Sequence, residues 1–184
     1  MPYPSQVNVD TIVAKAREMI EVEGVEALSL SKLATALNIK APSLYRYFDS
    51  KNALLRALNG DTAMRLTETM RAAAETQHDN PLLGMALAYH EFARANPAAY
   101  QLAFSSANDD LRPDEQMLEQ LALPLQAAMA SISGEADSLT ALRGAWALIH
   151  GFVSLELTGQ MRRGGDLEAT FVRVVEAYSR GWGS

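Results

Sequence analysis

Apolar residues in the first part of the chain recur at intervals of three and four, the spacing of one face of an α-helix. The first stripe consists of Ile12, Ala16, Met19 and Ile20. Asn8 or Asp10 can cap the start of this helix, and Gly24 stands where a left-handed C-terminal cap is expected. The same period continues to the end of the chain, with no alternating strand pattern and no internal repeat. The sequence therefore predicts an all-α fold.

Capping and turn residues divide the rest of the chain into further helices. A short helix capped by Ser29 or Ser31 is expected to end at Asn38, because asparagine tolerates the left-handed conformation. Asparagine-proline pairs at 80–81 and 96–97 combine an N-cap with proline at the first helical position, so two helices start there. Other helices are predicted at residues 42–48, 50–76, 112–132, 138–161 and from 167 onward, with a polar loop at 105–110. Pro124 must kink or divide the helix that contains it.

The segment from Leu28 to Leu58 has the organisation of a helix-turn-helix, with two short helices joined by about four residues. Leu44 and Phe48 are expected to hold the second helix against the first. The outer face then carries Ser43, Tyr45, Arg46 and Tyr47, and Lys51 opens the next helix. Hydroxyl and guanidinium groups suit phosphate oxygens and guanine edges, so this face is a candidate DNA-reading surface.

Charge is distributed unevenly along the chain. The total is −6, which argues against a uniform nucleic-acid-binding protein. Residues 28–56, however, hold five Lys and Arg against Asp49 alone, a net charge of +4. Residues 61–184 hold nine Lys and Arg against 16 Asp and Glu, a net charge of −7. The acidity therefore belongs to the C-terminal part.

Several classes of protein are not expected. The chain has no cysteine, so it has no disulfide, thiolate metal site or cysteine nucleophile. Its three histidines show no metal-ligand spacing, and no glycine-rich phosphate loop is present, so neither an enzyme nor a cofactor or metal is predicted. No signal peptide and no apolar run of about 18 residues is found, which favours a soluble, cytoplasmic protein without a membrane partner.

Residues 33–39 (LATALNI) and 43–55 (SLYRYFDSKNALL) lie in a block of about 45 residues that resembles, without a gap, the tetracycline-repressor (TetR) family of transcriptional regulators. Departures from the family pattern are Asn38 for glycine, Lys40 for a capping serine or threonine, and Tyr47 for histidine. The resemblance implies a DNA-binding domain over residues 1–55 and a larger helical ligand-binding and dimerisation domain over residues 56–184. It also implies a homodimer that places one recognition helix per subunit in adjacent major grooves. The expected DNA-contacting residues are Ser31, Lys32, Lys40, Ala41, Pro42, Ser43, Tyr45, Arg46, Tyr47 and Lys51.

The C-terminal part contains Trp146 and the pair His150-Gly151, which resemble the regulatory domain of one TetR subclass. Gly144, Gly151 and Gly159 are spaced to lie along one side of the predicted helix 138–161. Each glycine costs about 0.5–1 kcal/mol relative to alanine inside a helix, so close approach by another helix is expected. That helix belongs either to a partner subunit, as the family implies, or to the same chain. The predicted dimer-interface residues are Gly144, Gly151, Leu155, Gly159, Phe171, Val175 and Tyr178.

Aromatic and methionine residues at helical spacing suit an adaptable apolar pocket, although the same residues suit an ordinary core. The candidates are Met85, Tyr89, Phe92, Tyr100, Phe104, Met117, Trp146, Ile149, His150 and Val153. His150 is either a polar contact for a ligand or a hydrogen-bonded core histidine. The expected function is a regulator, acting as a repressor, that binds a palindromic operator as a homodimer and is released by a small, largely apolar effector. Alternatives are ligand-free regulation, a protein-interaction module that keeps the helix-turn-helix as a scaffold, and a hydrolase that depends on His150.

Overall fold

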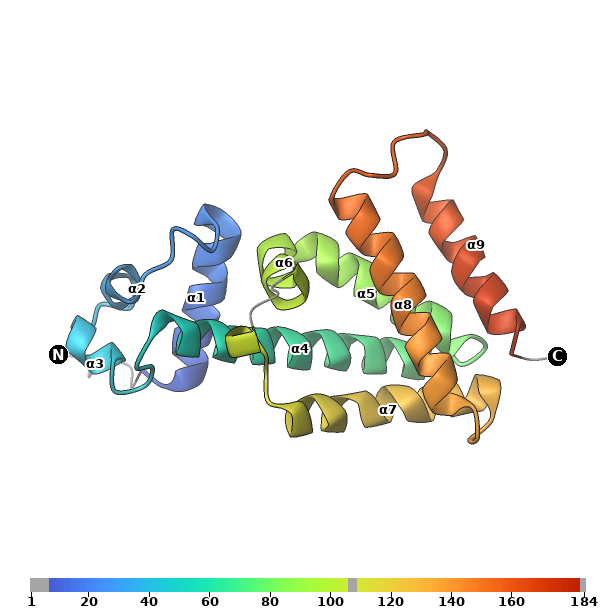
Figure 1. The fold of residues 1–184 in the computed structure, drawn as a ribbon, viewed down its shortest axis with the longest axis horizontal. Coiled ribbons are helices and arrows are strands. Elements are labelled where there is room, and N and C mark those ends of the chain that lie inside the picture. The colour runs from blue at the N-terminus through green and yellow to red at the C-terminus, as the bar shows by residue number, and fades with distance from the viewer. Residues whose placement is uncertain (1–6, 106–108, 183–184) are drawn as a thin grey trace. The chain divides into compact units, whose positions relative to one another are not determined.

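A computed structural model describes residues 7–105 and 109–182, and every regular element among these residues is helical, as the sequence predicts (Figure 1). The elements are α1 (Val9–Glu23), α2 (Leu30–Ala36), α3 (Ala41–Leu44), α4 (Lys51–Thr76), α5 (Pro81–Ala95), α6 (Pro97–Ser105), the 3-10 turn η1 (Asp109–Leu111), α7 (Glu115–Ser133), α8 (Ser138–Leu157) and α9 (Leu167–Arg180). None of the helices among the described residues is both long enough and apolar enough to cross a membrane.

The contacts divide the chain into two compact units. Unit 1 comprises Met1–Ala63 and Asn96–Asp114, and unit 2 comprises Met64–Ala95 and Glu115–Ser184. Helix α4 runs from the first unit into the second. The predicted boundary at residue 55 follows the helix-turn-helix alone, whereas the structure groups α6 and η1 with it.

Local signals set the ends of the first two helices in unit 1. The Asn8 side chain accepts a hydrogen bond from Thr11 N at 2.8 Å and is the N-cap of α1, and Gly24 ends that helix with φ of 83°. Ser29 caps α2 by accepting from Lys32 N, and Asn38 adopts φ of 54°. Asn8, rather than Asp10, and Ser29, rather than Ser31, are therefore the caps.

Helix α3 is shorter than predicted, because it ends at Leu44 instead of Phe48. Tyr47 N donates to the Leu44 carbonyl oxygen at 2.9 Å, a bond across three residues that tightens the chain into a turn. Lys40 provides no side-chain cap at the start of the helix. Burial fixes this short element instead, since Leu44 and Phe48 both lie in the core of unit 1, as predicted.

Helix α6 is tied to the helix-turn-helix by polar contacts. The Glu21 carboxylate accepts hydrogen bonds from Ala98 N at 3.0 Å and Ala99 N at 2.9 Å, which satisfies donors at the start of α6. Arg56 Nε donates to the Asp110 carbonyl oxygen at 2.7 Å, and Asn59 donates to that of Leu111 at 2.8 Å. These contacts explain why residues 96–114 belong to unit 1.

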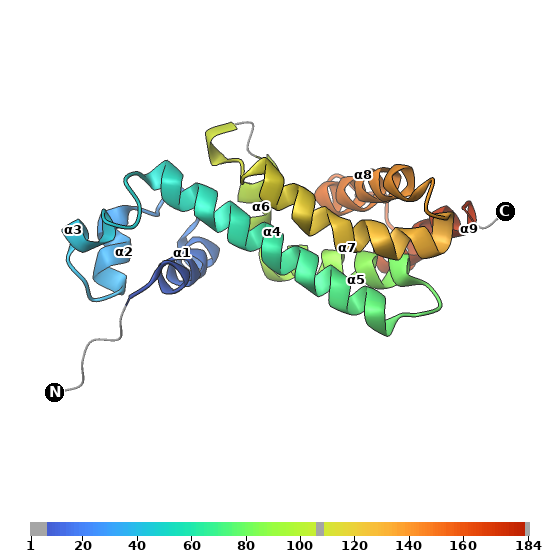
Figure 2. The same ribbon diagram turned by 90° about the horizontal axis from the view of Figure 1, so that it is seen from below.

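In unit 2, α7 and α8 pack against each other and α9 packs on α5 and α8 (Figure 2). Helix α7 begins at Glu115, later than predicted, and Pro124 lies inside it without dividing it. Helix α8 ends at Leu157 rather than at residue 161. The cause is Gly159, whose φ of 66° lies outside the helical region, so this glycine cannot share a helix side with Gly144 and Gly151.

Candidate functional site

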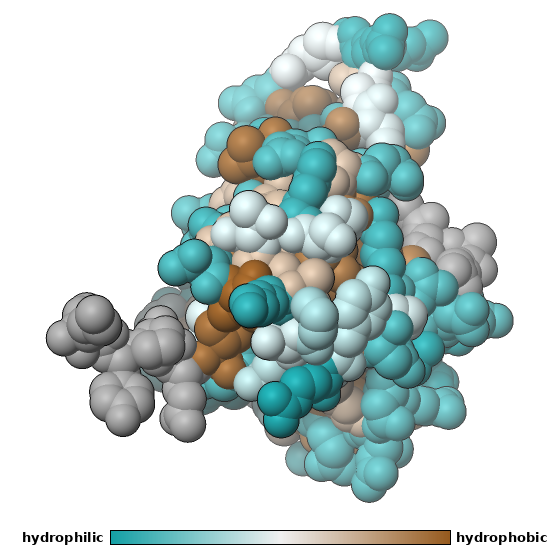
Figure 3. All heavy atoms as spheres, turned by 90° about the vertical axis from the view of Figure 1, so that its left-hand side faces the viewer, coloured by the Kyte–Doolittle hydropathy of each residue, from teal (hydrophilic) through white to brown (hydrophobic). Residues whose placement is uncertain are grey.

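The outer surface of α3 and the turn that follows it carries the predicted DNA-reading side chains. Tyr45 is 53% exposed, and Lys40 and Arg46 are exposed with no charged or hydrogen-bonding partner among the described residues. Ser31 and Pro42 are also exposed, while Ala41 and Ser43 are half-buried. Figure 3 shows that the face seen from the α3 end of Figure 1 is largely hydrophilic. The surface therefore offers cationic and hydroxyl groups that are free to contact a polyanion.

Three of the predicted contact residues are engaged inside the protein. Lys51 Nζ donates to the Val25 carbonyl oxygen at 3.1 Å, and the Tyr47 hydroxyl donates to that of Val7 at 2.7 Å. Lys32 Nζ lies 3.4 Å from the Glu23 carboxylate, an exposed ion pair that contributes little to stability. Lys51 and Tyr47 thus brace the helix-turn-helix, which sequence spacing could not show because their partners lie 26 and 40 residues away.

The interior of unit 2 contains a polar group formed by two of the predicted pocket residues, Tyr89 and His150. The Tyr89 hydroxyl lies 2.9 Å from His150 Nδ1, and Ser154 Oγ lies 3.4 Å from His150 Nε2. The Tyr89 and Trp146 rings meet edge to face at 5.5 Å. Burial lowers the pKa of the His150 imidazole below its ordinary value, which favours the neutral ring. His150 is therefore a hydrogen-bonded histidine on the inner side of α8.

The predicted pocket residues fall into both units. Met85, Tyr89, Phe92, Ile149 and Val153 are buried in unit 2, with Met117 half-buried on α7. Tyr100 and Phe104 lie instead on α6 in unit 1, where their ring centres are 5.0 Å apart and the rings are tilted by 48°. The contacts therefore support a cluster around Tyr89 and His150 in unit 2 and a separate aromatic pair in unit 1.

Arg65 is a candidate ligand contact that the sequence pattern does not mark. Its Nη1 atom is buried and has no hydrogen-bond partner among the described residues, and its guanidinium carbon lies 5.7 Å from the centre of the Phe92 ring. Asp61, one turn earlier on α4, forms an ion pair with Arg17. A buried donor without an acceptor is costly, so a group that accepts a hydrogen bond would be stabilised there.

A second polar cluster, also missed from the sequence, joins α5 to the end of α8. His90 Nε2 lies 2.6 Å from one Glu156 oxygen, and Arg94 forms an ion pair with the other. Burial alone would raise the pKa of the Glu156 carboxyl, but hydrogen bonds and charge from Arg94 and His90 outweigh it, so that pKa lies below its ordinary value. Glu156 is therefore an ionised carboxylate that holds both side chains.

The predicted dimer-interface residues do not share one environment. A Cβ atom on Gly144 would collide with the Tyr178 hydroxyl, which donates to the Ala141 carbonyl oxygen at 2.9 Å within the same chain. Phe171 and Val175 are fully buried in unit 2. Leu155, by contrast, is 40% exposed, and a Cβ on Gly151 would meet nothing within 4 Å. The close approach expected at Gly144 is therefore made inside one subunit, while Gly151 and Leu155 are open.

Known proteins resemble the chain over both of its halves. Residues 12–58 match the family described as bacterial regulatory proteins, tetR family, and residues 82–178 match the tetracyclin repressor-like C-terminal domain. A protein of Mycobacterium tuberculosis, described as an uncharacterized HTH-type transcriptional regulator, is 34% identical over 179 residues, which cover 94% of this chain and 80% of that protein.

Solved structures share the fold at lower identity. A protein of unknown function from Rhodococcus sp. RHA1 has a TM-score of 0.81 with 21% identity, and the match covers 100% of each chain. A variant of TetR from Acinetobacter baumannii AYE in complex with minocycline has a TM-score of 0.66 with 20% identity and 97% coverage of both chains. Together with the helix-turn-helix and the helical C-terminal part, the sequence matches establish that this chain belongs to the TetR family of transcriptional regulators.

Proposed function

We propose that this transcriptional regulator acts as a repressor that binds a palindromic operator as a homodimer and is released by a small, largely apolar effector. The observation that carries the proposal is that Lys40 and Arg46 flank the short helix α3, which the buried Leu44 holds in place. Both side chains are exposed and have no charged or hydrogen-bonding partner in the described part of the chain. Two such helices in a dimer would enter major grooves about 34–36 Å apart, one turn of the duplex. Arg46 suits a guanine edge, and Lys40 suits a phosphate.

DNA binding is tested by fluorescence anisotropy with duplex DNA from the region upstream of the gene, using the full chain. Arg46→Ala is expected to weaken binding by about 1–3 kcal/mol if it reads a base, and Lys40→Ala to reduce the salt dependence by about one phosphate contact. Arg180→Ala, which removes the same charge from the exposed end of α9, is the matched control and should leave binding unchanged. The proposal would be contradicted if the protein showed no sequence-preferring binding to this DNA. It would also be contradicted if Arg46→Ala left the affinity unchanged.

The cluster around Tyr89 and His150 supports an effector site in unit 2. It combines aromatic walls with a neutral, hydrogen-bonding imidazole, the usual chemistry of a small-molecule pocket. Arg65 adds an unsatisfied donor beside Phe92, which favours an effector that carries a hydrogen-bond acceptor on its apolar body. The TetR variant of Acinetobacter baumannii AYE, which shares this fold, was solved in complex with minocycline, and this complex supports a small-molecule effector for the present chain.

The outer side of α8 around Gly151 and Leu155 is the proposed subunit interface. Gly151→Ala adds a methyl group where the single chain leaves open space, so it should stabilise an isolated subunit by about 0.5–1 kcal/mol. If a partner helix packs over Gly151, the same methyl group should weaken the dimer by about 1–3 kcal/mol. Sedimentation equilibrium measures the dimer dissociation constant, which we expect to rise.

Ala127→Ser, at an exposed position on α7, adds one atom away from this face and serves as the control. Its dissociation constant should match that of the unmodified protein. A Gly151→Ala variant that is more stable and dimerises normally would place the interface elsewhere.

A further inference from the structure

Helix α4 carries a half-buried arginine, Arg65, whose charge has no counter-ion in the described part of the chain. Its Nη1 atom is buried without a hydrogen-bond partner, and neither Nε nor Nη2 forms a hydrogen bond or an ion pair with a described residue. The guanidinium carbon lies over the Phe92 ring, 5.7 Å from its centre. An aromatic ring attracts a cation but offers no conventional acceptor to its N–H groups. The guanidinium therefore retains unused donors and an uncompensated positive charge.

Both acidic residues within one turn of Arg65 on α4 are paired with other arginines. Asp61, on the preceding turn, forms an ion pair with Arg17. Glu68, on the following turn, accepts hydrogen bonds from Arg71 Nε at 2.9 Å and Arg71 Nη2 at 2.7 Å. Acidic residues at both spacings are suited to pair with an arginine on the same helix. The missing counter-ion of Arg65 therefore results from the fold and not from a lack of acidic neighbours in the sequence.

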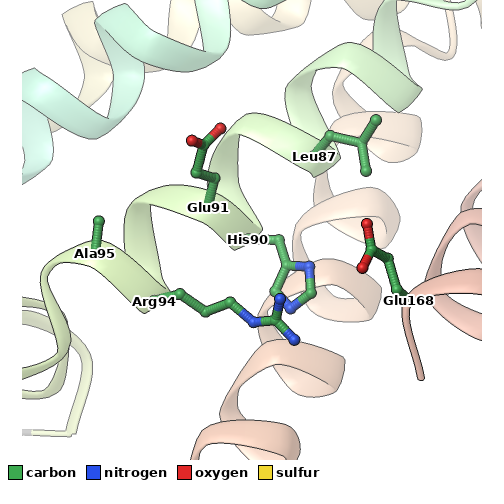
Figure 4. Close-up of a pocket in the computed structure, with 6 residues that line it drawn as sticks. All are labelled: Leu87, His90, Glu91, Arg94, Ala95 and Glu168. Carbon is green, nitrogen blue, oxygen red and sulfur yellow. The ribbon is translucent and has the colours of Figure 1, made fainter. Parts of the chain in front are cut away.

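Arg94, in the last turn of α5, has the partner that Arg65 lacks. It lines a surface hollow of unit 2 beside His90 (Figure 4), and it forms an ion pair with Glu156 of α8. The Arg94 side chain is 49% exposed, so water reaches its other N–H groups. Arg65 Nη1 is shielded from water, and a buried donor without an acceptor is costly. Of these two arginines, Arg65 is therefore the one that an added anion would stabilise more.

The ring that Arg65 contacts belongs to an apolar face of α5. Met85, Tyr89 and Phe92 follow one another at helical spacing and are buried in unit 2. Tyr89 is also part of the cluster with His150, where the effector site is proposed. An apolar molecule that lies along this face from Tyr89 would have its other end at Phe92, and so at Arg65.

We propose that the effector is an organic carboxylate whose ionised carboxyl group binds Arg65 while its apolar body lies along Phe92 and Tyr89. The two carboxylate oxygens would accept from Nε and Nη2, which form a two-pronged edge of matching geometry. Because the charge is shared over the whole guanidinium, the anion compensates for it without reaching Nη1. A neutral acceptor of the same shape would leave the charge uncompensated. The inference rests on the proposed function for the existence of an effector and adds its chemical class.

The test is a calorimetric titration of the full-length protein with two compounds of the same shape, 4-phenylbutanoate and the neutral 4-phenylbutanamide. We expect saturable binding of the carboxylate that is at least about tenfold tighter than that of the amide, as for hydrogen bonds to charged groups. Arg65→Gln should remove this preference, and Arg65→Lys, which keeps the charge, should retain part of it. Arg163→Gln removes the same charge from an exposed turn between α8 and α9 and should leave both affinities unchanged.

The stability of the ligand-free protein gives a second measurement. Arg65→Met keeps an unbranched apolar side chain but removes the charge and the unused donors. If Arg65 serves a ligand, this variant should have the same melting temperature as the unmodified protein or a higher one, because an unpaired, partly buried charge is lost. A lower melting temperature together with an unchanged affinity for 4-phenylbutanoate would assign Arg65 a structural role and overturn the proposal.

The outcomes of the titration separate this inference from the proposed function. Equal binding of the carboxylate and the amide overturns the carboxylate assignment, but the proposed effector site is retained if either compound releases operator DNA in the anisotropy measurement. Absence of saturable binding of 4-phenylbutanoate also overturns the assignment. Failure of the proposed function would instead be seen before any compound is added, as the absence of a sequence-preferring complex with operator DNA.

Discussion

Replacing Leu44 with alanine is expected to lower the free energy of unfolding by about 2–5 kcal/mol and to abolish DNA binding. Leu44 is fully buried and is the only residue of the four-residue helix α3 that is buried in the core of unit 1. The helix has no side-chain cap, so burial rather than local hydrogen bonding holds it in place. Removing the leucine side chain leaves a cavity at the point where the DNA-reading surface is supported.

Thermal denaturation followed by circular dichroism checks the stability, and anisotropy with operator DNA checks the function. For a chain of this length a loss of 1 kcal/mol lowers the melting temperature by about 2–4 °C. Tyr45→Ala is the matched control, because the neighbouring side chain is exposed and should change stability by less than about 0.5 kcal/mol. An unchanged melting temperature for Leu44→Ala would mean that α3 is not held by this contact.

Replacing Phe171 with alanine is expected to cost about 3–5 kcal/mol, the second large effect. The side chain is fully buried, and its ring contacts those of His90 at 4.8 Å and Phe152 at 4.9 Å. It therefore joins α9 to both α5 and α8. Its loss also removes the packing that fixes the His90 imidazole beside Glu156.

The concentration dependence of melting separates a core role for Phe171 from the predicted interface role. If Phe171 acts in the core, the substitution lowers the melting temperature by the same amount at two protein concentrations that differ by about tenfold, because folding within one subunit is affected. If Phe171 acts at a subunit interface, the decrease in melting temperature is larger at the lower protein concentration. Phe171→Leu, which keeps most of the apolar volume, should recover much of the stability.

The parts of the fold that sequence reasoning predicts are those set by neighbouring residues. Asn8 and Ser29 cap their helices through backbone donors three residues away. Gly24 and Asn38 adopt the positive φ that their residue types tolerate. Each of these features depends on residues that are close together in the sequence, so it can be predicted from the sequence alone.

The helix ends that differ from prediction depend on competing signals. Apolar residues continue beyond α8 to Met161, which favours a longer helix. The helix nevertheless ends at Leu157, because Gly159, two residues later, takes a positive φ. After α3, Tyr47 N donates to the Leu44 carbonyl oxygen three residues earlier, instead of to the carbonyl four residues earlier that would continue the α-helix. The spacing of apolar residues predicts which side chains face the core, but it does not predict the residue at which each of these two helices ends.

The candidate sites are harder to predict because their contacts are distant in sequence. Lys51 suits a phosphate by position, yet its ammonium is bound to a carbonyl 26 residues earlier. Glu156 gives no signal as a site residue, but it lies at the centre of the cluster with His90, 66 residues earlier. Residue type indicates the chemistry a side chain can perform, and only tertiary contacts decide whether it is available.

Within the helix-turn-helix, Leu44 and Lys51 support the structure, and Lys40, Tyr45 and Arg46 face outward. Since the two sets do not overlap, exchanging an outward side chain changes the contacts with DNA without opening the core. We expect operator preference in this protein to be evolvable by single substitutions at low cost in stability. New regulatory targets would then be accessible through viable intermediates, each of them a folded protein.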